Sequence, residues 1–147
     1  MNDPRCRTRT RLTTGIEDLA EALRSNVRGL YCAEAAVELL IGHLGWLLRG
    51  DFVGQFVETG EGLVDGTPMA WVDWPAAVAA LEAGRLPCSC GEGQVLRIAA
   101  SIADGVLIDL SQAVSGLDDA NIVRAARAIL HAAGHREAGV MVVEAGR

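Results

Sequence analysis

The feature that most constrains the fold is the apolar stretch at residues 28–48. Its apolar side chains recur at alternating steps of three and four residues, which is the spacing of a helix that packs closely against others. These positions are Leu30, Ala33, Val37, Leu40, Leu44 and Leu47. The second half of the stretch is apolar on its other sides as well. Such a helix is either central to the fold or part of a subunit interface, so we expect residues 28–48 to organise the protein.

Other helices are predicted from residues that commonly begin a helix and from apolar stripes at helical spacing. The expected N-cap residues are Asp73, Ser89, Asp109 and Asp118, and Thr14 with Glu17 resembles a capping box for a helix that runs to about residue 27. In the last helix, the stripe predicted to face inward is Ile122, Ala126, Ile129, Leu130 and Ala133.

Residues 58–72 differ from the rest of the chain because glycines and Pro68 interrupt any helical pattern there. Asp65-Gly66 is a turn signal, and residues 69–72 suit a short strand. We therefore predict a mainly α fold, a compact bundle of about five to six helices with a small β-hairpin or extended loop inserted near residues 58–72.

The length of 147 residues suits one compact domain. We predict a single helical domain at residues 12–135, preceded by a flexible basic arm at 1–11 and followed by a loose tail at 136–147. The arm holds the arginines from Arg5 to Arg11, whereas the whole chain has a net charge of -6. An acidic body opposes phosphate backbones, so nucleic-acid binding is not expected apart from this arm.

The sequence also bears on membrane insertion and on the compartment. Glu34 and Glu38 interrupt the most apolar segment, so we expect no membrane span. The first residues lack an apolar export signal, which predicts a cytoplasmic protein whose cysteines are mostly thiols. The use of arginine, alanine and glycine in place of lysine is typical of a GC-rich bacterial genome.

The composition argues against several classes of enzyme. The 13 basic residues are all arginine, and a chain without lysine has no Schiff-base chemistry and no Walker A lysine. The hydrolase, zinc-protease and EF-hand motifs are also missing from the sequence. We therefore favour a protein without catalytic activity and without a cofactor.

One group of residues points to zinc or thiol chemistry instead. Cys88 and Cys90 lie at the predicted start of a helix, where exposed amides lower the pKa of a thiol. Together with His131 and His135 they make a Cys₂His₂ set of the kind that binds tetrahedral zinc. A zinc-binding or thiol-redox protein is the first alternative.

A second alternative is a small enzyme. Glu34 and Glu38 share one face of the apolar helix, and His43 follows on the same helix. Paired carboxylates beside a histidine can hold a metal or act as acid and base. Such a stripe is also what the solvated edge of a helix looks like.

The hypothesis that we favour is a small cytoplasmic interaction or regulatory protein. It would bind itself, as a homodimer formed through the second helix, or another protein. Aromatic anchors are enriched at such contacts. The predicted contact residues are Leu40, Leu44, Trp46, Leu47, Trp71 and Trp74.

Overall fold

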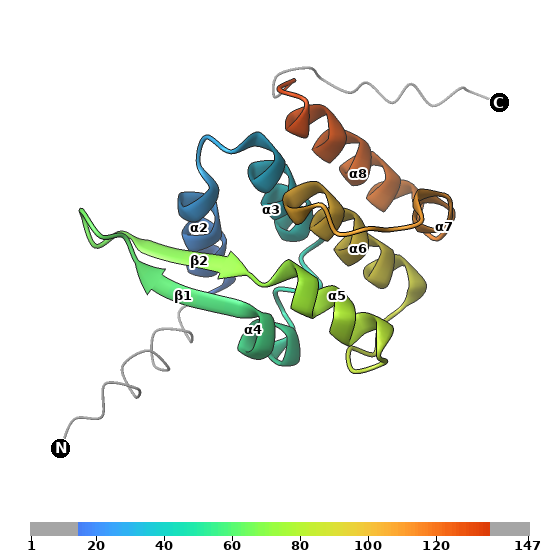
Figure 1. The fold of residues 1–147 in the computed structure, drawn as a ribbon, viewed down its shortest axis with the longest axis horizontal. Coiled ribbons are helices and arrows are strands. Elements are labelled where there is room, and N and C mark those ends of the chain that lie inside the picture. The colour runs from blue at the N-terminus through green and yellow to red at the C-terminus, as the bar shows by residue number, and fades with distance from the viewer. Residues whose placement is uncertain (1–14, 136–147) are drawn as a thin grey trace.

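The helix at the centre of the protein is α3 (Tyr31–His43), which packs against α2, α6 and α8. The computed structural model describes residues 15–135. Figure 1 shows α3 between α2 on one side and α6 and α8 on the other. Ala35, Ala36 and Leu40 of α3 have no exposed surface. Alanines at these positions let neighbouring helices approach closely, because they add little bulk between two backbones.

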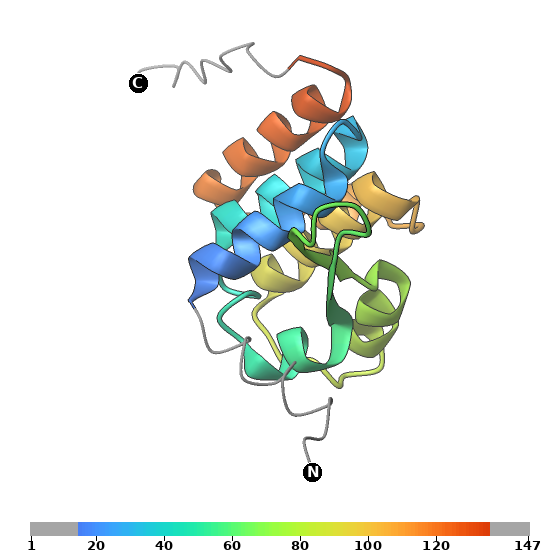
Figure 2. The same ribbon diagram turned by 90° about the vertical axis from the view of Figure 1, so that its left-hand side faces the viewer.

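The described residues form seven helices and one two-stranded antiparallel sheet. Besides α3, the elements are α2 (Ile16–Val27), α4 (Gly50–Phe56), β1 (Val57–Glu61), β2 (Pro68–Val72), α5 (Trp74–Glu82), α6 (Cys90–Asp104), α7 (Leu110–Ser115) and α8 (Asp119–Ala132). The predicted fold class, a helical bundle with a small hairpin, is therefore confirmed. Figure 2 shows α8 and α4 at opposite ends of the molecule. The predicted arm at 1–11 and tail at 136–147 lie outside the described residues.

Four helices begin where local sequence predicts. The side chains of Asp73, Asp109 and Asp118 each accept a hydrogen bond from a backbone N–H of the first helical turn. Ser89 and Glu92 form a complete capping box, each side chain bonding to the other's backbone N–H. The helix α2 differs, because its N-cap is Gly15 without a side-chain bond; Thr14 lies outside the described residues.

The second helix ends earlier than its apolar pattern predicts. It stops at His43, because Leu44 adopts a left-handed conformation with φ 64°. The chain then turns, and Trp46 enters the core, where its indole Nε1 donates to the backbone oxygen of Glu92 over 2.9 Å. The continuous apolar run at 28–48 is thus a helix followed by a turn that buries Trp46 and Leu47 and leaves Leu48 exposed.

The inward face of α8 is also not the predicted one. The buried residues are Asn121, Ala125 and Ala128, whereas Ile122 and Ile129 are 46% and 54% exposed. The physical reason is the close packing of α8 on α3, which admits alanine and excludes isoleucine. The predicted stripe through Ile122, Ala126, Ile129, Leu130 and Ala133 is therefore corrected: its two isoleucines lie at the surface, and none of its five residues is fully buried.

The two strands of the hairpin are aligned by five residue pairs, from Val57↔Val72 to Glu61↔Pro68. Its strand β2 packs against α2, whereas β1 contacts mainly β2 and its chain neighbour α4. Ala70 and Val72 are buried, and Trp71 points to the opposite face and is 39% exposed. The hairpin is therefore attached to the body along one face and one strand.

The packing of α8 yields the first prediction. Replacing Ala128 by leucine forces a larger side chain into the α3–α8 contact and lowers the free energy of unfolding by about 1–3 kcal/mol. Replacing Ile129 by alanine removes a half-exposed side chain and costs less than about 1 kcal/mol. Chemical denaturation of the two variants measures both values.

The outcome distinguishes the two faces of α8. A large loss for Ile129→Ala together with a small loss for Ala128→Leu would show that the isoleucine stripe faces the core and would contradict this packing.

Candidate interaction surface

The structure does not assemble the predicted zinc ligands. Cys88 and Cys90 are exposed beside the start of α6. His131 lies in the last turn of α8, where its Nε2 is 3.6 Å from Glu34 Oε2, and His135 is exposed beyond that helix. Within residues 15–135, no three or more His, Cys, Asp or Glu side chains form a group that could hold a metal ion. The physical reason is that His131 is used in a contact between α8 and α3.

The thiol chemistry expected at the α6 N-terminus is also altered by its surroundings. Burial raises the pKa of Cys88, and the negative charge of Glu92 raises it further. Cys88 precedes the N-cap Ser89, and Glu92 is the carboxylate that completes the capping box. Burial and the charge of Glu92 thus both oppose thiolate formation at Cys88. The sequence had suggested the opposite, a lowered pKa.

A second prediction follows for Cys88. Its raised pKa reduces the thiolate fraction at neutral pH, so iodoacetamide should alkylate it more slowly at pH 7–8 than an unstructured peptide thiol. The rate should rise as the pH increases through the raised pKa. Site-resolved mass spectrometry of the alkylated peptides measures this rate.

Replacing Glu92 by glutamine provides the matched comparison for that measurement. Removing the charge lowers the pKa of Cys88 and speeds its alkylation. Faster alkylation of wild-type Cys88 than of the peptide thiol would contradict the assigned cause.

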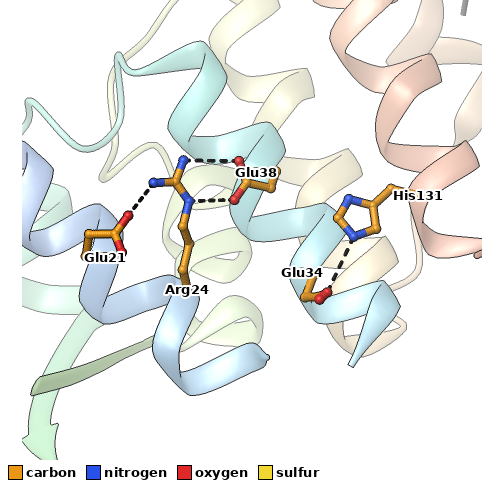
Figure 3. Close-up of polar contacts among 5 residues, drawn as sticks. All are labelled: Glu21, Arg24, Glu34, Glu38 and His131. Atoms are coloured by element: carbon orange, nitrogen blue, oxygen red, sulfur yellow. Dashed lines mark hydrogen bonds and ion pairs between the residues drawn. The ribbon is translucent and has the colours of Figure 1, made fainter. Parts of the chain in front are cut away.

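The three residues of the predicted acid–base site serve separate contacts between helices. The guanidinium of Arg24 on α2 donates to both carboxylate oxygens of Glu38, at 2.6 and 3.2 Å, and also to Glu21. Glu34 instead faces His131 of α8 (Figure 3). The carboxylates of Glu38 and Glu21 raise the pKa of Arg24, and the bonds from Arg24 to Glu38 hold α2 against α3. Glu34 and Glu38 thus point to different helices.

The third residue, His43, lies at the other end of α3 from Glu34. Nine residues of helix separate the two by about 13 Å along the axis. The Nδ1 of His43 lies 3.2 Å from Asn121 Oδ1, and Arg124 donates to the same oxygen over 3.1 Å. The predicted trio therefore does not share a catalytic site; it ties α3 to α2 and α8.

A surface depression of about 380 Å³ is also present between α5, α6 and the loop before α7. It was not predicted from the sequence. Its lining residues are Glu82, Gln94, Arg97, Leu107, Ile108, Asp109 and Gln112. The lining contains no cysteine, serine or histidine, so it lacks the usual pairs of nucleophile and base.

Four of the six predicted contact residues belong to the core. Leu40, Trp46, Leu47 and Trp74 are at most 8% exposed, so they stabilise the monomer and offer no surface to a partner. The apolar second helix is central to the fold, which explains its apolarity without an interface. Only Leu44 and Trp71 are substantially exposed, at 40% and 39%.

The most exposed apolar side chains lie instead at the tip of the hairpin. Leu63 and Val64 have relative exposures of 105% and 100%. Figure 1 shows this tip projecting beyond the helices. Sequence reasoning missed these residues, although the glycines and Asp65-Gly66 around them located the turn. The available signal was the apolar pair Leu63-Val64 between Gly62 and Asp65-Gly66, since side chains in a turn are commonly exposed.

The tip has a defined backbone. Gly62 N–H donates to Thr67 O over 2.8 Å, and Gly66 N–H donates to Gly62 O over 3.0 Å. Asp65 Oδ1 accepts from Thr67 N–H, and hydrogen bonds from the side chain and then the backbone of Thr67 lower the pKa of Asp65. Gly66 adopts φ 67°, which glycine tolerates without strain. The turn thus presents Leu63 and Val64 on an ordered support.

The outer face of the hairpin carries Trp71. Its indole Nε1 donates to Glu58 Oε2 on the paired strand over 3.1 Å. Its ring covers Gly60, where an added Cβ would lie 3.2 Å from the ring. Tryptophan above a strand glycine restores packing that the glycine lacks. The predicted contact residue Trp71 is therefore part of the same hairpin as the apolar tip.

A second set of exposed apolar residues lies on the C-terminal helices. Leu110 and Val114 share a face of α7, and Ile122 and Ile129 share a face of α8. They are between 46% and 57% exposed, roughly half as exposed as the hairpin tip. These helices provide partly covered apolar faces, whereas the hairpin offers fully exposed side chains.

Comparison of the chain with family models, with curated proteins and with solved structures found no match. Among the described residues, no helix is long and apolar enough to cross a membrane. The arguments for function therefore rest on the surface itself.

Proposed function

We propose that this chain is a small interaction or regulatory protein without catalytic activity, which associates with itself through its β-hairpin. This proposal keeps self-association but moves it from the second helix to residues 57–72. The observation that carries it is the complete exposure of Leu63 and Val64 on an ordered turn.

Energetics support a contact at the tip. Full burial of a leucine or valine side chain contributes about 1.5–3 kcal/mol each. Two such side chains in each of two copies amount to a substantial apolar contribution, from which the entropy cost of association must be subtracted. Trp71 lies on the same hairpin and adds an aromatic side chain of the kind enriched at protein contacts.

The surroundings of the other candidate residues support a role other than catalysis. Glu38 and His43 are engaged in contacts between helices, and Glu34 faces His131 across such a contact. The cysteines at positions 32, 88 and 90 are free thiols, in keeping with a reducing compartment such as the cytoplasm. The chain's net charge of -6 favours a protein partner over nucleic acid.

Sedimentation velocity over a range of protein concentrations tests this proposal. We expect the wild-type protein to form dimers, and the double variant Leu63→Ser/Val64→Ser to raise the dissociation constant by at least about tenfold, a change equivalent to about 1.4 kcal/mol. The double variant should fold normally, since both side chains are fully exposed.

The matched control is Leu107→Ser. Leu107 is 94% exposed but lies in the loop between α6 and α7, so its replacement should leave the dissociation constant unchanged. A wild-type protein that stays monomeric at every concentration would contradict the proposal, and so would a dimer that the double variant does not weaken.

A further inference from the structure

The surface depression between α5, α6 and α7 contains an arginine whose charge has no partner within the described residues. Four arginines of residues 15–135 are half-buried. Three of them, Arg24, Arg49 and Arg124, each donate to a side-chain oxygen of the protein. The fourth, Arg97, makes no hydrogen bond and no ion pair among residues 15–135. A half-buried guanidinium has lost part of its water, so a ligand that brings an acceptor to it is favoured.

The guanidinium of Arg97 lies against its own helix. Side chains of a helix point back toward its N-terminus, which brings Arg97 over residue 93, one turn earlier. That residue is a buried glycine, and a Cβ added to it would lie 3.4 Å from Arg97 Nη1. The missing side chain at Gly93 thus gives the guanidinium a defined place, in the lining of the depression.

The rest of the lining brings negative charges and apolar side chains to Arg97. The helix α6 contacts both α5 and α7. Glu82 comes from the end of α5, and Asp109 is the N-cap of α7. Leu107 and Ile108 come from the loop between α6 and α7. Since Arg97 forms an ion pair with neither carboxylate, the depression offers a ligand both signs of charge beside an apolar portion.

We infer that this depression binds a free α-amino acid with an apolar side chain, with its carboxylate on Arg97 and its ammonium group between Glu82 and Asp109. The site would make the protein responsive to a small metabolite. It goes beyond the proposed self-association and does not depend on it, because its lining residues all belong to α5, α6, α7 and the loop before α7.

The balance of charges selects a ligand that carries both signs. A carboxylate alone would gain Arg97 but meet two carboxylates, whereas an amine alone would gain those two but meet Arg97. A guanidinium binds a carboxylate through two parallel hydrogen bonds. Asp109 uses Oδ1 to accept from Gln112 N–H, and its second oxygen can accept from an ammonium group. A zwitterion is therefore the ligand that satisfies all three charges.

The size of the depression and its apolar residues point to the same class of ligand. Its volume of about 380 Å³ lies at the small end of the range of about 300–1,000 Å³ for small-molecule sites. Leu107 is 94% exposed, and the apolar side chain of a bound amino acid would cover part of it. The side-chain amides of Gln94 and Gln112 add hydrogen-bond donors and acceptors to the lining. Leucine is accordingly the probe that we choose.

Titration of the isotope-labelled full-length protein with L-leucine, followed by the amide NMR signals of residues 93–112, tests the inference. We expect saturable changes in chemical shift. N-acetylleucine lacks the ammonium group and leucinamide lacks the carboxylate. Each should bind with a dissociation constant at least about tenfold higher than that of leucine.

Two arginine variants provide the matched comparison. Arg97→Gln removes the charge but keeps a polar side chain, and it should raise the dissociation constant for leucine by at least about tenfold. Arg85→Gln removes an exposed arginine from the loop between α5 and α6, and it should leave that constant nearly unchanged. Amide spectra that match the wild type away from the substituted position confirm that both variants are folded.

Every outcome decides the inference. The absence of saturable shifts with leucine up to about 10 mM overturns the site. Equal binding of N-acetylleucine overturns the zwitterion in favour of a simple anion, and equal binding of leucinamide overturns it in favour of a cation. Leucine binding that Arg97→Gln does not weaken overturns the placement of the carboxylate. None of these results bears on self-association, which sedimentation of the hairpin variants measures separately.

Discussion

The close contact of α3 with its neighbours through alanine is the constraint on which the rest of the structure depends. Ala35 and Ala36 of α3 are fully buried, as are Ala99 and Ala100 of α6, and Ala128 of α8 is nearly so. The small side chains let these helices approach closely, and larger ones such as Leu40 of α3 and Leu96 of α6 are buried around them. Trp46, in the turn that follows α3, is also buried, whereas Ile122 and Ile129 of α8 lie at the surface. Most of the apolar side chains of the second helix are buried in the core of the monomer.

Polar contacts at the margins of this alanine core orient the helices. Arg24 and Glu38 join α2 to α3, and Asn121 meets His43 between α8 and α3. The residues that looked catalytic in the sequence are thus interhelical contacts. Within residues 15–135, these residues are engaged between helices. The hairpin differs, because its tip projects beyond the helices and carries the fully exposed side chains of Leu63 and Val64.

Local signals predicted more of this structure than long-range ones. Asp73, Ser89 and Asp118 begin helices because capping depends on neighbours within one turn, and Asp65-Gly66 located the hairpin turn. The prediction of the buried face of α8 was wrong. The isoleucine side of that helix is the more hydrophobic one, but the alanine side is the one that packs against α3. The predicted zinc ligands do not come together in the described residues. Spacing along the chain gives no information on the distance between the start of α6 and the end of α8.

The central proposal is that the exposed tip of the hairpin carries self-association. Amide hydrogen exchange of the wild-type protein, resolved at Leu63 and Val64 and followed as protein concentration rises, tests it most directly. The account predicts that these two amides exchange rapidly in the monomer and become protected as the dimer forms, while the amides already bonded within the hairpin change little. Rapid exchange at Leu63 and Val64 in a protein that is fully dimeric would contradict it.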